Sequence, residues 1–289
     1  MSVQLIQVPY DSGHRGRRLG KGPLRFVEQG MARILHGRGH RVDVECLEVE
    51  TDPMNPIKTT FDVNRLLAKQ VRDALEFGKF PLVLAGNCNA CIGTIAGLNQ
   101  ADSGVIWFDA HGDFNTPETT FSGYLDGMAL ALATGDCWQG LLDTIPGFIP
   151  VAGNRIVHIG GRDLDPQESA RFSRSGASLV DSKSLQEQGI RQGLEAAFKR
   201  LRQRTDRVYV HLDMDIVDPA VACSKDFAPA GGLTVEQVVE AVHTVKEYFH
   251  VQAGAIAACD PDCDKHGRAV RAGLAFAQTL VPESGIQLE

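Results

Sequence analysis

The sequence from Ile106 to Gly127 is IWFDAHGDFNTPETTFSGYLDG. An apolar run leads directly into acidic and imidazole groups that recur at every second residue, namely Asp109, His111 and Asp113. Side chains two residues apart on a strand share a face, so all three can point into one cleft. The pattern therefore predicts a buried strand that ends in a polar site.

A second strand repeats this arrangement later in the chain. The sequence VYVHLDMDIVDP, from Val208 to Pro219, places Asp213 and Asp215 two apart at the C-terminal end of another apolar run. Together the two stretches supply four carboxylates and one imidazole. Such hard ligands suit a pair of divalent cations such as Mn²⁺ better than a structural zinc, which prefers Cys and His in a closed tetrahedron. One motif alone is common at a capped strand end, but both together favour a metal centre.

Length and composition favour a single globular domain that does not bind nucleic acid. The chain has 289 residues with no linker-like tract, which favours one domain over residues 1–289. A net charge of −7 disfavours nucleic acid as a partner, because phosphate contacts require a basic surface. No signal peptide or membrane-length apolar run is present, and the seven cysteines are scattered, so we expect a cytoplasmic protein with reduced thiols and no membrane partner.

Short apolar runs alternate with amphipathic stretches along the whole chain. This alternation predicts an α/β fold with a mostly parallel sheet covered by helices on both faces. In such sheets ligands bind beyond the carboxyl ends of the strands, where both acidic motifs lie. The expected strands are Val3–Val8, Val42–Leu47, Pro81–Ala85, Gly104–Phe108, Arg155–Ile159, Ser178–Val180, Arg207–Leu212 and Gln252–Ala258. The expected helices include Pro23–His36, Val63–Phe77, Ser184–Arg204, Val235–His250 and Gly267–Leu280.

Two further stretches bear on ligands. No glycine-rich nucleotide loop follows a strand, so a nucleotide cofactor has no support from the sequence. The basic cluster HRGRRLGK, from His14 to Lys21, is expected to be a solvated loop. Its position after the first strand can bring arginine residues near the mouth of the site.

Four segments, in this order and spacing, carry a resemblance to a known family. They are GNCNACIGT at 86–94, FDAHGDFNTPETTFSG at 108–123, IGGRDLDPQE at 159–168 and HLDMDIVDP at 211–219. Over essentially the full chain they resemble the arginase (ureohydrolase) family. The resemblance implies a three-layer α/β/α fold with an eight-stranded sheet, a homo-oligomer such as a trimer or hexamer, and a two-manganese site whose bridging hydroxide attacks a guanidinium carbon.

The resemblance also implies a role for each acidic or imidazole group. Asp109 and Asp213 would bridge the two ions, Asp113 would complete one coordination shell, and His111 and Asp215 would complete the other. A guanidinium carbon is a poor electrophile, and two cations supply hydroxide by lowering the pKa of bound water. Asp113 is expected to pass the hydroxide proton to the departing amine.

The substrate class follows from the same resemblance. The segment NTPETTFSG is similar to the one that binds an α-carboxylate, with Asn115 and Ser122 as the binding residues, and Asp165 and Glu168 resemble the pair that receives the α-ammonium group. Agmatine lacks the carboxylate, so an arginine-like amino acid is favoured. Asp165 and Pro166 also fit the N-cap and first position of a helix, and both interpretations can hold together.

Three positions depart from the family pattern. Cys88 stands where the family has a metal-binding His. A thiolate binds manganese less favourably than imidazole does, so one or two Mn²⁺ per chain, or a softer metal at Cys88, all stay open, as does an ordinary buried thiol. Asp126 replaces another His, which the resemblance implies shuttles protons or assists substrate binding, and it is our second candidate catalytic residue, with a carboxylate that can pair with the guanidinium. It would be a poor acid at neutral pH unless burial raised its pKa. Ala258 replaces a guanidinium-binding Glu, for which Asp260 or Asp262 is a candidate substitute.

The cysteine in the first motif and the segment GDFNTPETT followed by GYLDGM resemble the N-omega-hydroxy-L-arginine amidinohydrolase branch. The leading hypothesis is a metal-dependent hydrolase that releases urea or hydroxyurea and ornithine. The main alternative is a catalytically impaired homologue that binds a ligand or assembles with partners. A third, with Cys88 as nucleophile, has no His nearby in sequence to activate the thiol.

Overall fold

A single parallel sheet organises the part of the chain that the computed structural model describes, residues 1–283. Residues 284–289 of the predicted domain lie outside it. The eight strands follow the order β4-β1-β5-β10-β9-β6-β7-β8, and every neighbouring pair is parallel. Their bounds are β1 Ser2–Val8, β4 Arg41–Cys46, β5 Lys79–Ala85, β6 Gly104–Phe108, β7 Ile156–Gly160, β8 Ser178–Asp181, β9 Arg207–Asp213 and β10 His250–Ala257.

Side chains alternate in direction along the strands and so create a core on each face of the sheet. In β9, Val208, Val210 and Leu212 belong to one cluster, whereas Tyr209 belongs to the other. All four side chains are buried, because successive strand residues point to opposite faces and helices cover both. Strands buried on both faces are continuously apolar, which is why these runs stand out in the sequence.

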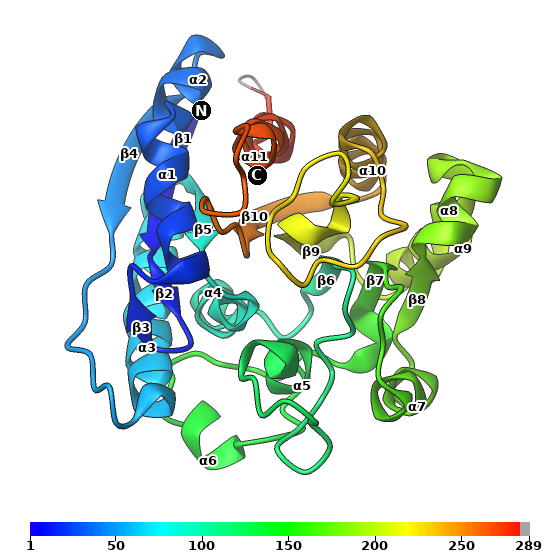
Figure 1. Ribbon diagram of the computed structural model, residues 1–289, viewed down its shortest axis with the longest axis horizontal. Helices are drawn as coiled ribbons and strands as arrows, with labels where there is room; N and C mark the ends of the chain where they lie inside the picture. The colour runs from blue at the N-terminus through cyan, green and yellow to red at the C-terminus, as the bar shows by residue number, and fades with distance from the viewer. Residues whose placement is uncertain (284–289) are drawn as a thin grey trace.

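The helices form two layers, one on each side of the sheet (Figure 1). The first layer contains α1 Gly22–Glu28, α2 Met31–Gly37, α8 Ser182–Gln188, α9 Ile190–Arg202, α10 Val235–Tyr248 and α11 Arg268–Leu280. The second contains α3 Pro56–Glu76, α4 Cys91–Leu98, α5 Ala129–Ala133, α6 Gln139–Leu142 and α7 Pro166–Ser175. The predicted three-layer α/β/α fold is thereby confirmed. No helix within residues 1–283 is long and apolar enough to cross a membrane.

Two predicted helices are each divided in two. The helix expected over residues 23–36 breaks before α2 at Gly30, whose φ is 92°. The helix expected over residues 184–204 breaks at Gly189, whose φ is 84°. Glycine adopts positive φ without a Cβ clash, so the chain turns at both positions while the apolar period continues.

Short elements beside the sheet lead into the region beyond its strand ends. The hairpin of β2 (Tyr10–Asp11) and β3 (His14–Arg15) and the 3₁₀ turn η1 (Arg18–Lys21) follow β1. Gly86, just after β5, lies against this segment so closely that a Cβ there would be 2.2 Å from the carbonyl oxygen of Tyr10. A glycine is therefore required for the β5 end and the N-terminal hairpin to meet.

Candidate metal centre and substrate cavity

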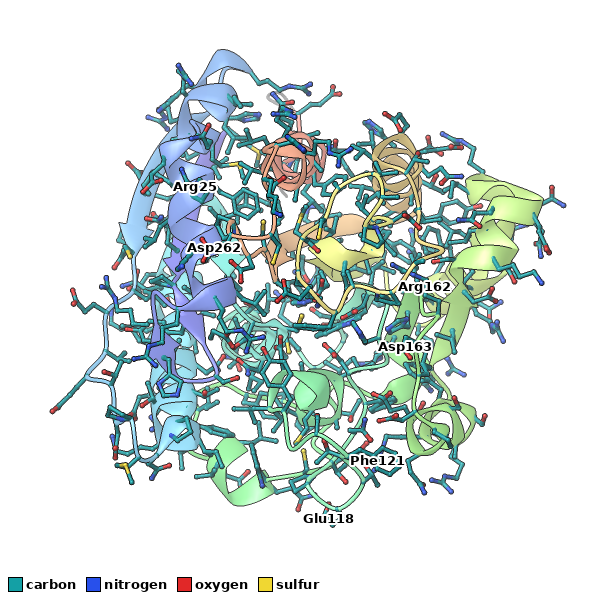
Figure 2. All side chains as sticks on the ribbon, viewed as in Figure 1. Arg25, Glu118, Phe121, Arg162, Asp163 and Asp262 are labelled. Atoms are coloured by element: carbon teal, nitrogen blue, oxygen red, sulfur yellow. The ribbon has the colours of Figure 1, made fainter. Side chains whose placement is uncertain are left out.

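A cavity of about 420 Å³ opens beyond the carboxyl ends of the strands, as expected for a sheet of this kind. Its walls come from the loops after β6, β7 and β9 and from the turn η1. Asp163, labelled in Figure 2, follows β7 and lines the cavity. The lining residues are Arg18, His111, Asp113, Asn115, Thr120, Ser122, Tyr124, Asp126, Gly127, Asp163, Asp165, Glu168, Lys225 and Phe227.

The end of β6 positions the first acidic motif. Asp109 is fully buried, where its carboxylate accepts hydrogen bonds from Trp107 Nε1 at 3.1 Å and from the His111 backbone N–H at 2.9 Å. Asp113 has a positive φ of 50°, a conformation that is uncommon for a residue with a side chain. The first turn of α5 holds it there, because the backbone N–H of Leu130 donates to its carbonyl oxygen at 2.8 Å.

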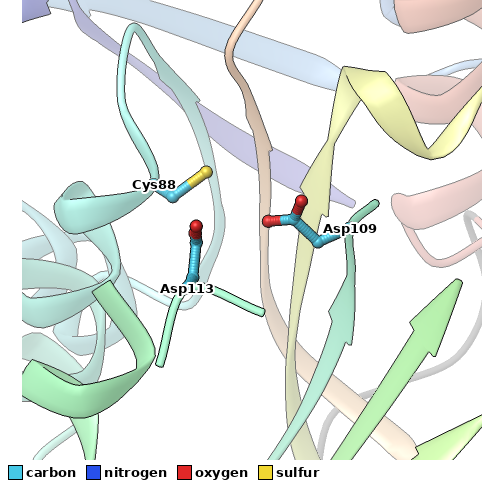
Figure 3. A group of neighbouring side chains, drawn as sticks. All are labelled: Cys88, Asp109 and Asp113. Atoms are coloured by element: carbon cyan, nitrogen blue, oxygen red, sulfur yellow. The ribbon is translucent and has the colours of Figure 1, made fainter. Parts of the chain in front are cut away.

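The turn after β5 brings Cys88 to the same place. The Cys88 backbone N–H donates to Asp126 Oδ1 at 2.6 Å, and Asn87 Nδ2 donates to Asp126 Oδ2 at 2.9 Å. Ligand atoms of Cys88, Asp109 and Asp113 all lie within 4.8 Å of one another. Figure 3 shows the three side chains pointing toward one another from separate segments of the chain.

The end of β9 carries the second acidic motif, and here a lysine joins it. Lys225, from the loop between β9 and α10, lies with its Nζ 2.9 Å from Asp213 Oδ2 and 2.8 Å from Asp215 Oδ2. His111 Nδ1 is also 2.8 Å from Asp215 Oδ2. Asp109, His111 and Asp215 form a second group of candidate ligands, with their ligand atoms within 4.8 Å of one another.

Burial and neighbouring charges shift the pKa values of the ionisable groups in this centre. Burial lowers the pKa of Lys225, but Asp213 and Asp215 outweigh it and raise that pKa well above its usual range. Burial opposes ionisation of Asp215, yet the charges of Lys225 and His111 prevail and hold its pKa well below the usual range. Burial and the neighbouring Asp109 raise the pKa of Asp113 well above its ordinary value.

The residues around Cys88 fit a divalent cation. Five buried carboxylates meet in this region, namely Asp109, Asp113, Asp126, Asp213 and Asp215, whereas the cationic partners described above are the buried Lys225 and the partly exposed His111. Buried carboxylates are costly unless a cation balances them. Asp113 Oδ2 is also buried and has no hydrogen-bond partner within residues 1–283. A metal ion held by Cys88, Asp109 and Asp113 would satisfy that oxygen and offset the excess negative charge.

The four predicted substrate-binding residues all line the cavity. Asn115 Nδ2 donates to Asp165 Oδ2 at 2.8 Å. Glu168 accepts hydrogen bonds from the backbone N–H groups of Phe114 and Asp165, both at 2.9 Å. Asp165 is the N-cap of α7 with Pro166 next to it, so the helix-terminus interpretation is confirmed. The assignment of Asn115, Ser122, Asp165 and Glu168 to substrate stays a prediction.

The three departures from the family pattern have distinct surroundings. Asp126 lines the cavity, and burial raises its pKa to about 7 despite the nearby Lys225. Ala258 is fully buried with a φ of 61°. Neither candidate substitute for the missing Glu lines the cavity: Asp260 accepts the Asp262 backbone N–H, and Asp262, labelled in Figure 2, pairs with Lys21.

Several cavity residues were missed in the sequence. Lys225 lies in a loop, ten residues after Asp215, with no motif spacing to mark it. Tyr124 donates from its hydroxyl to Asp11 Oδ1 at 3.1 Å and lines the cavity, and Phe227 lies under the Lys225 ammonium at 5.0 Å. Arg18 is the residue of the basic cluster that reaches the cavity, as the position of that cluster suggested.

The protein is thus an α/β/α protein with a parallel sheet and with a carboxylate-rich candidate metal centre beyond the strand ends. Comparison with known proteins identifies the family. A model of the arginase family matches residues 1–281, and the chain therefore belongs to the arginase family.

Individual relatives agree with this assignment. The arginase of Bacillus caldovelox is 29% identical, over 97% of this chain and 98% of its own. The non-hepatic arginase 3 of Xenopus laevis is 32% identical, over 84% of this chain and 72% of its own. The crystal structure of the Bacillus cereus arginase matches with a TM-score of 0.89 at 28% identity, covering 99% of this chain and 100% of that chain. The N-omega-hydroxyarginine branch stays a prediction.

Proposed function

We propose that this protein is a manganese-dependent amidinohydrolase. It would cleave a guanidino C–N bond in an arginine-like amino acid, such as arginine or N-omega-hydroxyarginine, and release urea or hydroxyurea and ornithine. One observation carries the proposal: Asp113 belongs to the candidate metal group with Cys88 and Asp109 and also lines the cavity that contains the predicted substrate-binding residues.

The metal ligands and the proton-transfer group would have separate roles in the hydrolysis. A divalent ion bound at Cys88, Asp109 and Asp113 would lower the pKa of water and so supply hydroxide at neutral pH. With one Asp113 oxygen bound to that ion, its other oxygen can take the proton of the hydroxide that adds to the guanidinium carbon, and it can return that proton to the departing nitrogen as the C–N bond breaks. The amine then leaves neutral.

Four other residues that line the cavity support an amino-acid substrate. Asn115 and Ser122 offer an amide and a hydroxyl to an α-carboxylate, while Asp165 and Glu168 offer carboxylates to an α-ammonium group. Burial raises the pKa of Glu168 above its ordinary value, so a cationic ligand group there would favour its ionised form. A decarboxylated amine would leave the amide and the hydroxyl unused.

The test compares Asp113→Asn with wild type, with Asp143→Asn as the control. Asp143 is exposed and does not line the cavity. Ornithine release from arginine and N-omega-hydroxyarginine is measured after loading with Mn²⁺. We expect turnover in wild type and in the control but none in Asp113→Asn. Undiminished turnover in Asp113→Asn would remove this residue from the chemistry.

A second candidate function is ligand binding without catalysis. The ammonium of Lys225 on Asp213 and Asp215 favours it, because a site that has adapted to a protein cation can lose metal chemistry. Binding of arginine by calorimetry with no ornithine release at any Mn²⁺ concentration would support this function. Assembly as a homo-oligomer, a trimer or hexamer, stays a prediction from the family resemblance.

A further inference from the structure

Lys225 is fixed at the second acidic motif by its surroundings. Its side chain is 4% exposed, and its Nζ lies over the ring of Phe227, 5.0 Å from the ring centroid. The loop that carries it is tied to the segment after β10, because the Asp260 backbone N–H donates to the Ser224 carbonyl oxygen at 2.7 Å. Contacts of the ammonium with the ring and of the loop backbone with its neighbour therefore position the lysine.

The ammonium uses the oxygens that a second metal ion would need. It lies 2.8 Å from Asp215 Oδ2 and 2.9 Å from Asp213 Oδ2, and His111 Nδ1 reaches the same Asp215 oxygen. Oxygen ligands of divalent ions lie at about 2.0–2.6 Å. An ion at that distance from these two oxygens would be in contact with the like-charged ammonium of Lys225.

The other candidate group remains available to a metal. Ligand atoms of Cys88, Asp109 and Asp113 lie within 4.8 Å of one another, and Asp113 Oδ2 has no hydrogen-bond partner within residues 1–283. The two halves of the centre are thus unequal. One half is already paired with the Lys225 ammonium, whereas Asp113 in the other half has no ion-pair partner within residues 1–283.

We propose that the ammonium of Lys225 takes the place of one of the two cations, so that this chain binds a single divalent ion, at Cys88, Asp109 and Asp113. The inference rests on the proposed metal site for the location of that ion. Unlike a metal, the lysine cation stays when the protein is treated with a chelator. Asp213 and Asp215 are therefore neutralised by a permanent charge, and only the Cys88 half of the centre depends on metal supply.

The experiment counts metal ions in wild type and three variants. Lys225→Met removes the charge and keeps the stem, whereas Lys225→Arg keeps the charge. Lys246→Met is the matched control, because Lys246 is half-buried and its Nζ binds the carbonyl oxygens of Thr279 and Val281 rather than the acidic centre. Each protein is stripped with a chelator, reloaded with excess Mn²⁺, freed of unbound metal and measured by elemental analysis and native mass spectrometry.

We expect one Mn²⁺ per chain in wild type, Lys225→Arg and Lys246→Met, and two in Lys225→Met. Two ions in wild type would overturn the inference, and this count decides even if Lys225→Met does not fold. One ion in both wild type and folded Lys225→Met would also overturn it, while leaving the proposed metal site intact. No ion in wild type but one in Lys225→Met would support the role of Lys225 and contradict the proposed Cys88 site. No ion in any protein would overturn both.

Discussion

Replacing Lys225 by Met should destabilise the metal-free protein strongly. The ammonium makes two contacts, at 2.8 and 2.9 Å, in a site where the lysine is 4% exposed. At an effective dielectric constant near 20, each contact is an attraction of about 6 kcal/mol before desolvation. Desolvation offsets most of that attraction in wild type, but removing the lysine charge leaves Asp213 without its cation and Asp215 with His111 alone, at a cost of about 3–5 kcal/mol. Methionine preserves the apolar stem, so packing contributes little to this loss.

The assay is thermal unfolding followed by circular dichroism in the presence of a chelator. For a chain of this size, a loss of about 3–5 kcal/mol lowers Tm by on the order of 10 °C. Lys246→Met should lose less, because its ammonium is only half-buried and water can replace it. Adding Mn²⁺ should recover part of the deficit in Lys225→Met. A Tm within about 2 °C of wild type in chelator would refute the view that Lys225 neutralises this centre.

Three further predictions concern single side chains. Cys88→His should tighten Mn²⁺ binding on the order of tenfold, because imidazole suits manganese better than a thiol does; an unchanged affinity by calorimetric titration would exclude position 88 as a ligand. Asn115→Ala should raise KM for arginine roughly tenfold through loss of a hydrogen bond to a charged group, with kcat and the affinity for agmatine as a competing ligand nearly unchanged; equal effects on arginine and agmatine would contradict a carboxylate contact. His158 is fully buried, and burial lowers its pKa to about 4. Between about pH 6.5 and 4 only the unfolded chain takes up the proton, so the free energy of unfolding of wild type should fall by up to about 1.4 kcal/mol for each pH unit that the pH is lowered. His158→Phe should remove this part of the pH dependence, and the same pH dependence in both proteins, measured by urea unfolding, would disprove it.

The sheet could be predicted because its strands are buried on both faces and so form continuous apolar runs. Helix boundaries were harder to predict from the sequence. The apolar period continues through Gly30 and Gly189 although the backbone turns there, so periodicity alone joined separate helices. The helix α4, Cys91–Leu98, was missed because all of its residues are buried, which leaves no amphipathic period to detect.

The site was predictable where its residues follow strands. Asp109, His111, Asp113, Asp213 and Asp215 come at fixed spacing after apolar runs, and the structure brings them to one region. Lys225 arrives from a long loop whose path depends on tertiary contacts, such as the hydrogen bond from the Asp260 backbone to Ser224. No local pattern marks a residue positioned in that way.

The most direct test of the central claim is turnover of the Mn²⁺-loaded protein with arginine, N-omega-hydroxyarginine, agmatine and guanidinobutyrate offered in parallel, with bound metal counted on the same samples. We predict metal-dependent release of ornithine from an α-amino-acid substrate and no comparable turnover of the two compounds that lack the α-amino-acid group. Fully loaded protein that binds arginine but turns over none of the four would contradict the assignment as an amidinohydrolase.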